Sequence, residues 1–221
     1  DDPSITVRFP VIGEDKTYFL VWTTTPWTLP ANLALAVGAS IDYAFVEHGG
    51  ETLILAAQLV DKVLGEGPHT IVRRVKGEDL MGLRYQRLFD ELPAEGDICR
   101  VLTADFVSTD NGTGIVHTAP AYGVDDLALG QAHGLPVVHG IGLDGCFKDE
   151  VTPVQGQFFK DRGAAYASAG GGPANQEPKY VERSKNNQDK EKWSDSMIAH
   201  QNDMEKKIRG YDKESKKRHG D

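Results

Sequence analysis

The sequence predicts a mainly β fold in the form of a β-barrel. Short runs rich in β-branched and aromatic side chains recur along residues 1–163, and Gly, Asp and Asn turn signals separate them. Helical spacing of apolar residues appears in only two short stretches of the same region. Many short strands with few helices favour a barrel over a sheet built from βαβ units.

Alternating or apolar runs place the strands in order along the chain. The first two flank a turn at Gly13, and the pattern further along predicts a hairpin with Gly49 and Gly50 at its turn. The expected strands are residues 4–9, 17–23, 33–37, 42–47, 52–56, 70–75, 98–104, 114–118 and 137–141.

Two short helices complete the predicted elements. Residues 57–64 carry apolar side chains at helical spacing, and Gly65 ends the run. A second helix over residues 124–133 opens on Asp125 and Asp126 and closes at Gly134. Carboxylates in a first turn complement the positive end of a helix, so capping alone would explain both of them.

Residues 18–32 are the stretch around which the rest is organised. An apolar run leads into Thr23, Thr24 and Thr25, and two prolines after them forbid regular strand pairing. The sequence predicts a stiff irregular loop that presents hydroxyls and backbone N–H groups at fixed positions. Those groups suit ester or ribose oxygens, although a Thr-rich strand end that caps a turn has the same composition.

Two motifs together resemble one known family. Residues 23–32 (TTTPWTLPAN) and 111–126 (NGTGIVHTAPAYGVDD) closely resemble the editing (CP1) domain of isoleucyl-tRNA synthetases. The related valyl and leucyl inserts differ, with an arginine and an acidic residue where this chain has Thr25 and Trp27. The resemblance covers roughly residues 2 to 160 and implies a closed β-barrel with small flanking helices.

The resemblance also implies the site residues. The aspartate that matches Asp126 anchors the substrate's α-ammonium group in the family, through a charge-assisted hydrogen bond. Positions that match Thr24, Thr25 and Asn32 place the amino acid, the terminal ribose and the attacking water, so these four residues form the expected catalytic set. The expected substrate-binding residues are Trp22, Thr23, His117, Ala119 and Tyr122.

Two of these residues keep alternative interpretations. His117 lies between small residues that leave space for a ligand, and it would act as a general base or, as the resemblance implies, as a steric gate. Tyr122 offers an aromatic face to the substrate, or packs half-buried. His133, His139 and Cys146 match no standard metal site, so we expect no metal and no cofactor.

Charge divides the chain into a body and a tail. Residues 175–221 hold 12 Lys and Arg and 10 Asp and Glu, which leaves residues 1–174 with 12 basic and 23 acidic residues and a net charge of −11. Such a body is unsuited to tight non-specific nucleic-acid binding. We expect an editing domain at 1–163, a Gly/Ala-rich linker at 164–174, and a charged tail at 175–221.

The tail and the compartment follow from composition. The tail is expected to be disordered and flexible or to form one amphipathic helix, and nothing identifies a partner for it. No apolar run reaches the ~18–20 residues that span a bilayer, and no signal peptide opens the chain, so we expect no membrane partner. Cys99 and Cys146 form no Cys-x-x-Cys, which predicts reduced thiols and a cytoplasmic location.

The sequence therefore predicts an aminoacyl-tRNA deacylase that hydrolyses valine wrongly esterified to the 3′ end of tRNA(Ile), with valyl-adenylate as a further candidate substrate. The His-Ile-Gly-His and Lys-Met-Ser-Lys-Ser signatures of class I catalytic domains do not occur, so amino-acid activation is not expected. The alternative is a non-catalytic module that binds a tRNA 3′ end or a protein and recruits a partner through its tail.

Overall fold

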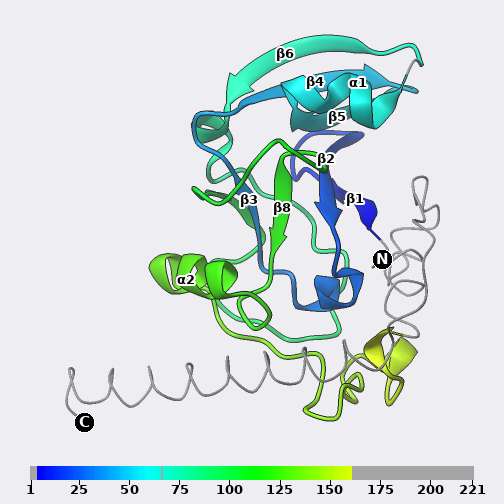
Figure 1. The fold of residues 1–221 in the computed structure, drawn as a ribbon, viewed down its shortest axis with the longest axis vertical. Helices are drawn as coiled ribbons and strands as arrows, with labels where there is room; N and C mark the ends of the chain where they lie inside the picture. The colour runs from blue at the N-terminus through cyan, green and yellow to red at the C-terminus, as the bar shows by residue number, and fades with distance from the viewer. Residues whose placement is uncertain (1–3, 66, 161–221) are drawn as a thin grey trace.

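The computed structural model describes residues 4–65 and 67–160, and within them the fold is mainly β, as predicted (Figure 1). The expected linker at 164–174 and tail at 175–221 lie outside the described residues. The strands are β1 Ile5–Pro10, β2 Thr17–Thr23, β3 Ala34–Val37, β4 Asp42–His48, β5 Glu51–Ala56, β6 Thr70–Lys76, β7 Arg100–Thr103 and β8 Ile115–Thr118. The helices are α1 Val60–Leu64 and α2 Val124–His133, with 3₁₀ turns η1 Pro26–Ala31, η2 Ala57–Leu59, η3 Gly77–Leu80 and η4 Thr152–Val154.

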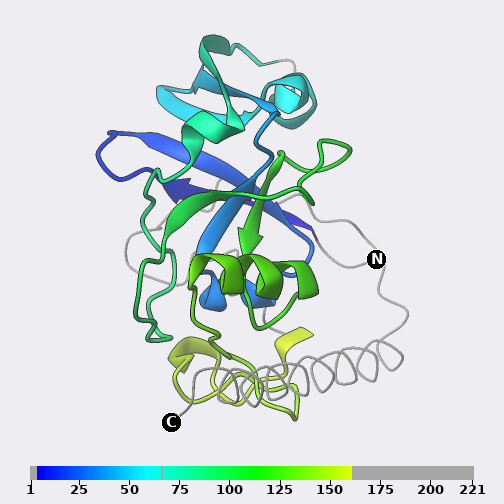
Figure 2. The same cartoon turned by 90° about the vertical axis from the view of Figure 1, so that its left-hand side faces the viewer.

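One sheet runs through the whole described fold. Its order is β6-β4-β5-β2-β8-β3-β7, and β1 pairs with β2 off this path. Strands β4, β5 and β6 form a layer at one end with α1, while α2 and η1 lie at the other end (Figure 1). Figure 2 shows α2 lying across the strands, above the segment that ends at residue 160.

The named strands form a curled sheet and not the continuous closed barrel that the resemblance implies. The path is open between β1 and β7, and residues 84–85 span this gap through isolated bridges, Val11 with Tyr85 and Arg84 with Arg100. Regular pairing stops at this point because Cys99, next to β7, has a φ of 59°, which lies outside the extended region.

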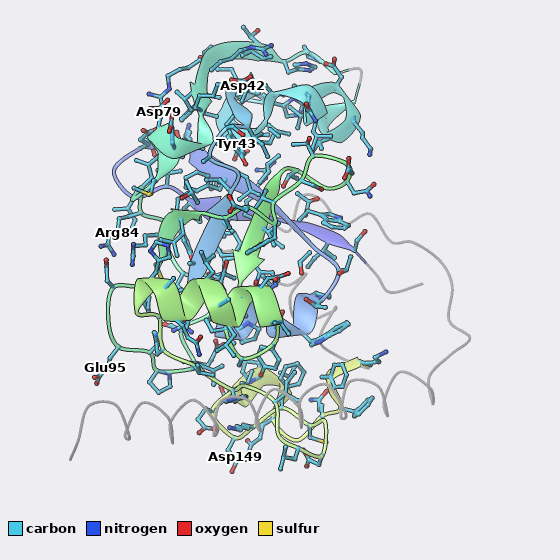
Figure 3. All side chains as sticks on the ribbon, turned by 60° about the vertical axis from the view of Figure 1, so that its left-hand side comes forward. Asp42, Tyr43, Asp79, Arg84, Glu95 and Asp149 are labelled. Carbon is cyan, nitrogen blue, oxygen red and sulfur yellow. The ribbon has the colours of Figure 1, made fainter. Side chains whose placement is uncertain are left out.

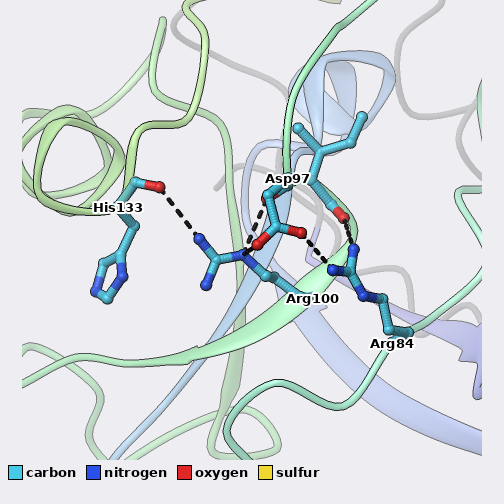
Figure 4. Close-up of polar contacts among 5 residues, drawn as sticks. Arg84, Asp97, Arg100 and His133 are labelled. Atoms are coloured by element: carbon cyan, nitrogen blue, oxygen red, sulfur yellow. Dashed lines mark hydrogen bonds and ion pairs between the residues drawn. The ribbon is translucent and has the colours of Figure 1, made fainter.

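An ion-pair network fixes the chain that crosses this gap (Figure 4). The Asp97 carboxylate pairs with Arg84 and, at 3.0 Å, with Nε of Arg100. The Arg84 guanidinium also donates to the carbonyl of Ile98, and Arg100 donates to the carbonyl of His133 at the end of α2. The arginines thereby connect β7, the bridging segment and α2, and they hold the pKa of the exposed Asp97 carboxyl below its usual range.

Apolar side chains fill the inside of the curl. The main core includes Phe9, Phe19, Leu35, Ile54 and Phe89, all almost fully buried. A second, smaller core lies on the other face of β4 and β5 and is covered by α1. This arrangement explains why the central strands are apolar on both faces, whereas β1 and β6 are mostly half-buried or exposed.

Tyr43 joins the layer of β4, β5 and β6 to the rest of the sheet (Figure 3). Its hydroxyl donates to the carbonyl of Gly114 at 2.6 Å and accepts the N–H of Gly38 at 3.0 Å. The side chain is fully buried, and burial raises the pKa of its phenol to about 12. The turns at Gly38 and Gly114, which are far apart in the sequence, therefore bind the same hydroxyl.

Most of the predicted elements are present, and the expected strand at 137–141 is not. In that segment the hydroxyl of Tyr122 accepts the backbone N–H groups of Gly140 and Ile141, at 2.8 and 3.0 Å. Because these donors are already bonded, they cannot enter a strand ladder, and Ile141 makes only an isolated bridge to Phe147. Among the described residues, no helix is both long and apolar enough to cross a membrane.

Candidate functional site

The two sequence motifs meet at the ends of neighbouring parallel strands. Strands β2 and β8 pair in parallel at Trp22 and Val116, and both point toward η1 and α2 (Figure 1). The first motif continues from the end of β2, and the second continues from the end of β8 into α2. Because the two strands run in the same direction, the groups that follow them lie at the same edge of the sheet.

The first motif folds into a buried 3₁₀ turn and not into the irregular loop that its prolines predict. Pro26 occupies the first turn of η1, where its missing N–H is not needed. The backbone N–H of Thr28 donates to the carbonyl of Thr25, and that of Asn32 donates to Leu29. Residues 26–31 are all buried, so the turn is fixed by packing on both sides.

Three threonine hydroxyls and one imidazole form a continuous hydrogen-bonded cluster. The Thr23 and Thr25 hydroxyls are 3.3 Å apart, and the Thr25 and Thr28 hydroxyls are 3.2 Å apart. The Thr28 hydroxyl lies 3.1 Å from Nε2 of His117, which comes from β8. This cluster joins the two motifs directly through side chains.

His117 is buried and electrically neutral at physiological pH. Its side chain is 5% exposed, and burial lowers the pKa of the imidazole to about 4. Nδ1 of the ring has no hydrogen-bond partner among the described residues. A group with so low a pKa is a weak proton acceptor.

Asp126 is a partly buried carboxylate with no cation beside it. Its Oδ2 accepts the backbone N–H of Ala119 at 3.0 Å, which connects the first turn of α2 to the end of β8. Burial raises the pKa of the carboxyl to about 6, and the neighbouring charge of Asp125 adds to the rise. Among the described residues no Lys, Arg or His forms an ion pair with it.

Comparison with known proteins identifies relatives for most of the chain. It is 46% identical over 160 residues to an isoleucine–tRNA ligase of Clostridium kluyveri, 49% over 154 residues to that of Clostridium novyi, and 48% over 163 residues to that of Methanothermobacter thermautotrophicus. These alignments cover 72%, 70% and 73% of this chain and 15% of each relative. The chain is thus a relative of the isoleucine–tRNA ligases. It spans about 15% of their length.

The other comparisons add little to this relationship. No family model matches the chain. Solved structures that resemble it include GlLeuRS-CP1, with a TM-score of 0.49 and 17% identity over 61% of this chain and 66% of that chain. The P. knowlesi cytosolic leucyl-tRNA synthetase editing domain gives a TM-score of 0.47 and 15% identity, over 58% of this chain and 62% of the other.

In this relative of the isoleucine–tRNA ligases, the predicted site residues divide into two groups. Thr23, Thr25 and His117 share the hydroxyl cluster, and Ala119 contacts Asp126. Thr24 is exposed at the end of β2, with its side chain outside the cluster.

Two further predicted residues have their polar groups bonded within the fold. Asn32 is 1% exposed, its amide nitrogen donates to Ala34, and its carbonyl accepts the hydroxyl of Tyr85 at 2.6 Å. Both ends of the amide are thus bonded within the fold, each with one of its two hydrogen-bonding positions, and a substrate contact by Asn32 stays a prediction. Tyr122 is bonded to residues 140–141, which agrees with its packing interpretation.

The glycines of the second motif provide close packing and not the ligand space that their small size predicts. Gly112 has a φ of +72°, and a Cβ at this position would lie 2.7 Å from the indole ring of Trp22. At Gly114 a Cβ would lie 2.5 Å from that of Ala56. Trp22 is therefore packed against the motif's backbone. The glycines allow β8 to approach β2 and β5 closely.

Thr28 is a site residue that sequence reasoning missed. It lies three residues after Thr25, a spacing that brings two side chains onto one face of a 3₁₀ turn. Recognising that Pro26 opens a turn, as prolines often do, would have identified it.

A cavity of about 330 Å³ lies away from the threonine cluster, and the residues that line it are Ser40, Ile41, Asp42, Ala57, Gln58, Arg74 and Thr109.

Proposed function

We propose that residues 1–163 form an editing domain that hydrolyses valine wrongly esterified to the 3′ end of tRNA(Ile), and that valyl-adenylate is a further substrate. The observation that carries this proposal is the partly buried carboxylate of Asp126, which forms no ion pair among the described residues and bonds Ala119, two residues after the His117 of the neutral histidine–threonine cluster. The relationship to isoleucine–tRNA ligases supplies the substrate class.

Asp126 is the proposed anchor for the α-ammonium group of the aminoacyl ester. A carboxylate held away from water, with a raised pKa and no cation of its own, gains most from a ligand that brings a positive charge. An ammonium bound there would restore the low pKa of an ion-paired carboxylate. The Ala119 N–H fixes one carboxylate oxygen, which leaves the group well oriented for this contact.

The remaining groups place the ester and its water. Aminoacyl esters are activated by their own ammonium group, so positioning and oxyanion support are sufficient, and no protein nucleophile is required. Thr24 and Thr25 are the proposed contacts for the ester and the terminal ribose, since they follow β2 directly. Asn32 contributes by fixing the end of η1 through Ala34 and Tyr85.

His117 is the proposed steric gate against isoleucine. Isoleucine gains more from burial than valine does, so a pocket can prefer valine only by excluding the larger side chain. One methylene is worth only ~1–3 kcal/mol in binding, and isoleucyl enzymes are themselves the standard example of that limit. A buried imidazole fixed by Thr28 supplies a wall of constant size.

Single-turnover deacylation of valyl-tRNA(Ile) and isoleucyl-tRNA(Ile) tests the proposal. The unaltered chain should hydrolyse the valyl ester, and His117→Ala should retain this reaction while gaining hydrolysis of the isoleucyl ester. Asp126→Asn should lose about 10- to 100-fold on the valyl ester, the range that a charge-assisted hydrogen bond provides.

Three outcomes would contradict this assignment. A chain that binds the acylated tRNA end without hydrolysing it would be the non-catalytic module that the sequence also allows. Loss of valyl hydrolysis in His117→Ala, with no gain on the isoleucyl ester, would make the histidine a catalytic group. Unchanged hydrolysis rates in Asp126→Asn would show that Asp126 does not anchor the ammonium group. Asp125→Asn, an exposed neighbour, is the matched control and should behave as the unaltered chain does.

A further inference from the structure

Proton counting in the threonine cluster sets the state of His117. We propose that Thr28 is a positioning residue that holds His117 as the tautomer protonated on Nε2, which leaves Nδ1 as a buried hydrogen-bond acceptor. The gate role rests on the proposed function, whereas the tautomer follows from hydrogen-bond geometry alone.

The direction of the Thr28 bond is the first step. A hydroxyl carries one proton, and the Thr28 hydroxyl lies 2.8 Å from the carbonyl oxygen of Thr25, which can only accept. If that proton pointed at His117 instead, two oxygen lone pairs would face each other at 2.8 Å. The Thr28 hydroxyl therefore donates to the carbonyl and has only lone pairs to offer to Nε2 of His117, 3.1 Å away.

The second step fixes the imidazole. An oxygen that has only lone pairs to offer requires a proton on the nitrogen that faces it, so Nε2 carries the proton. Because burial holds the pKa of His117 at about 4, the ring is neutral at physiological pH and carries one proton in all. Nδ1 is then the unprotonated nitrogen, and it has no donor within the described residues.

The same counting orders the rest of the cluster. With the Thr28 proton already used, the 3.2 Å contact between the Thr25 and Thr28 hydroxyls requires Thr25 to donate. The 3.3 Å contact between Thr23 and Thr25 then requires Thr23 to donate, while Thr23 accepts the backbone N–H of Thr25 at 3.0 Å. Each of the three hydroxyls therefore donates its proton to one acceptor, and no two lone pairs face each other in the cluster.

Two consequences follow for recognition. The Nε2 bond prevents the ring from rotating, and a wall that cannot rotate excludes a longer side chain more sharply than a mobile one. Nδ1 offers a lone pair to an O–H or N–H donor, and a buried acceptor without a donor costs about 1–3 kcal/mol. A water or substrate group that supplies this donor would recover that free energy on binding.

Nitrogen NMR tests the tautomer in the unliganded chain. Long-range proton–nitrogen correlation of the ¹⁵N-labelled chain distinguishes a protonated ring nitrogen from an unprotonated one, and the signals missing from His117→Gln assign the residue. The expected result at neutral pH is a protonated Nε2 and an unprotonated Nδ1. A protonated Nδ1, or an averaged pair of signals, would overturn the proposal whether or not any variant folds.

Substitutions at Thr28 test the positioning role. Thr28→Val keeps the shape and removes the hydroxyl, so the separation between the two nitrogen shifts should collapse, and Thr28→Ser should restore it. Thr17→Val, which removes another buried hydroxyl, one bonded to Asp15, is the control and should leave the signals unchanged. A folded Thr28→Val with unchanged signals would refute the role of the hydroxyl.

The ratio of single-turnover rates on valyl and isoleucyl esters tests the consequence for selectivity. Thr28→Val should lower this ratio about tenfold, within the range for one methylene, and Thr28→Ser should recover it. If Thr28→Val lost the tautomer preference of His117 but kept the rate ratio, the fixed orientation of the ring would not be what excludes isoleucine. If the unaltered chain hydrolyses neither ester, the proposed function fails and the nitrogen spectrum still decides the tautomer.

Discussion

Replacing Asp126 by asparagine should remove a charge that the folded chain keeps at a cost. The pKa of this carboxyl rises from 3.8 to about 6 on burial. The folded protein therefore binds the proton more tightly than the unfolded chain does, and the ionised form destabilises the fold. The penalty is absent below about pH 4, grows between pH 4 and 6, and is complete above pH 6. A difference of about two pKa units corresponds to about 3 kcal/mol.

His117 produces the opposite dependence over nearly the same pH range. Its pKa falls from 6.5 to about 4, so the unfolded chain takes up a proton that the folded chain refuses. The resulting stability is complete above about pH 6.5 and is lost as the pH falls toward 4, again by about 3 kcal/mol. The two contributions nearly cancel in the unaltered chain.

Urea denaturation of three chains between pH 4 and 8 tests this reasoning. Asp126→Asn keeps an oxygen for the Ala119 N–H and should be up to about 3 kcal/mol more stable than the unaltered chain at pH 7.5, an advantage that disappears near pH 4. His117→Gln should show the reverse slope, with stability falling as the pH rises through 4 to 6. If Asp126→Asn were equally or less stable at pH 7.5, burial would not be what perturbs this carboxyl.

Two further substitutions test the packing that holds the site. Tyr43→Phe should lower the free energy of unfolding by about 2–4 kcal/mol, because Gly38 N–H and Gly114 C=O both lose their partner; a loss below 1 kcal/mol in urea titration would contradict this. Gly112→Ala should lower the free energy of unfolding, measured by the same titration, by at least about 2 kcal/mol. A φ of +72° disfavours a residue with a Cβ, and that Cβ would clash with the ring of Trp22. A fully stable variant would mean that β8 does not approach β2 closely.

Hydrophobic alternation predicted the strands well, because burial between two layers enforces it. The hairpin of β4 and β5, the stop at Gly65 and the helix that ends at Gly134 all lie where turn chemistry places them. Segment 137–141 failed because a distant hydroxyl, that of Tyr122, takes its backbone donors. Such competition between partners remote in sequence leaves no local pattern. The open path between β1 and β7 has a different origin, the positive φ of Cys99, which the sequence does not indicate either.

The site was predictable as a set of residues and not as a network. The motifs identified Asp126, His117 and the threonines, yet their chemistry depends on distances that only the parallel pairing of β2 and β8 creates. Nothing in the local sequence marks Thr28 as a site residue. Its role arises because η1 places its hydroxyl next to the imidazole of His117, 89 residues away in the chain. Asn32 shows the converse, since a residue type suited to substrate contact is taken up by the core. Asp126 has one carboxylate oxygen bonded to Ala119 and no ion pair among the described residues, and Nδ1 of His117 has no partner there, so these are the polar groups for which the proposed function predicts a ligand contact.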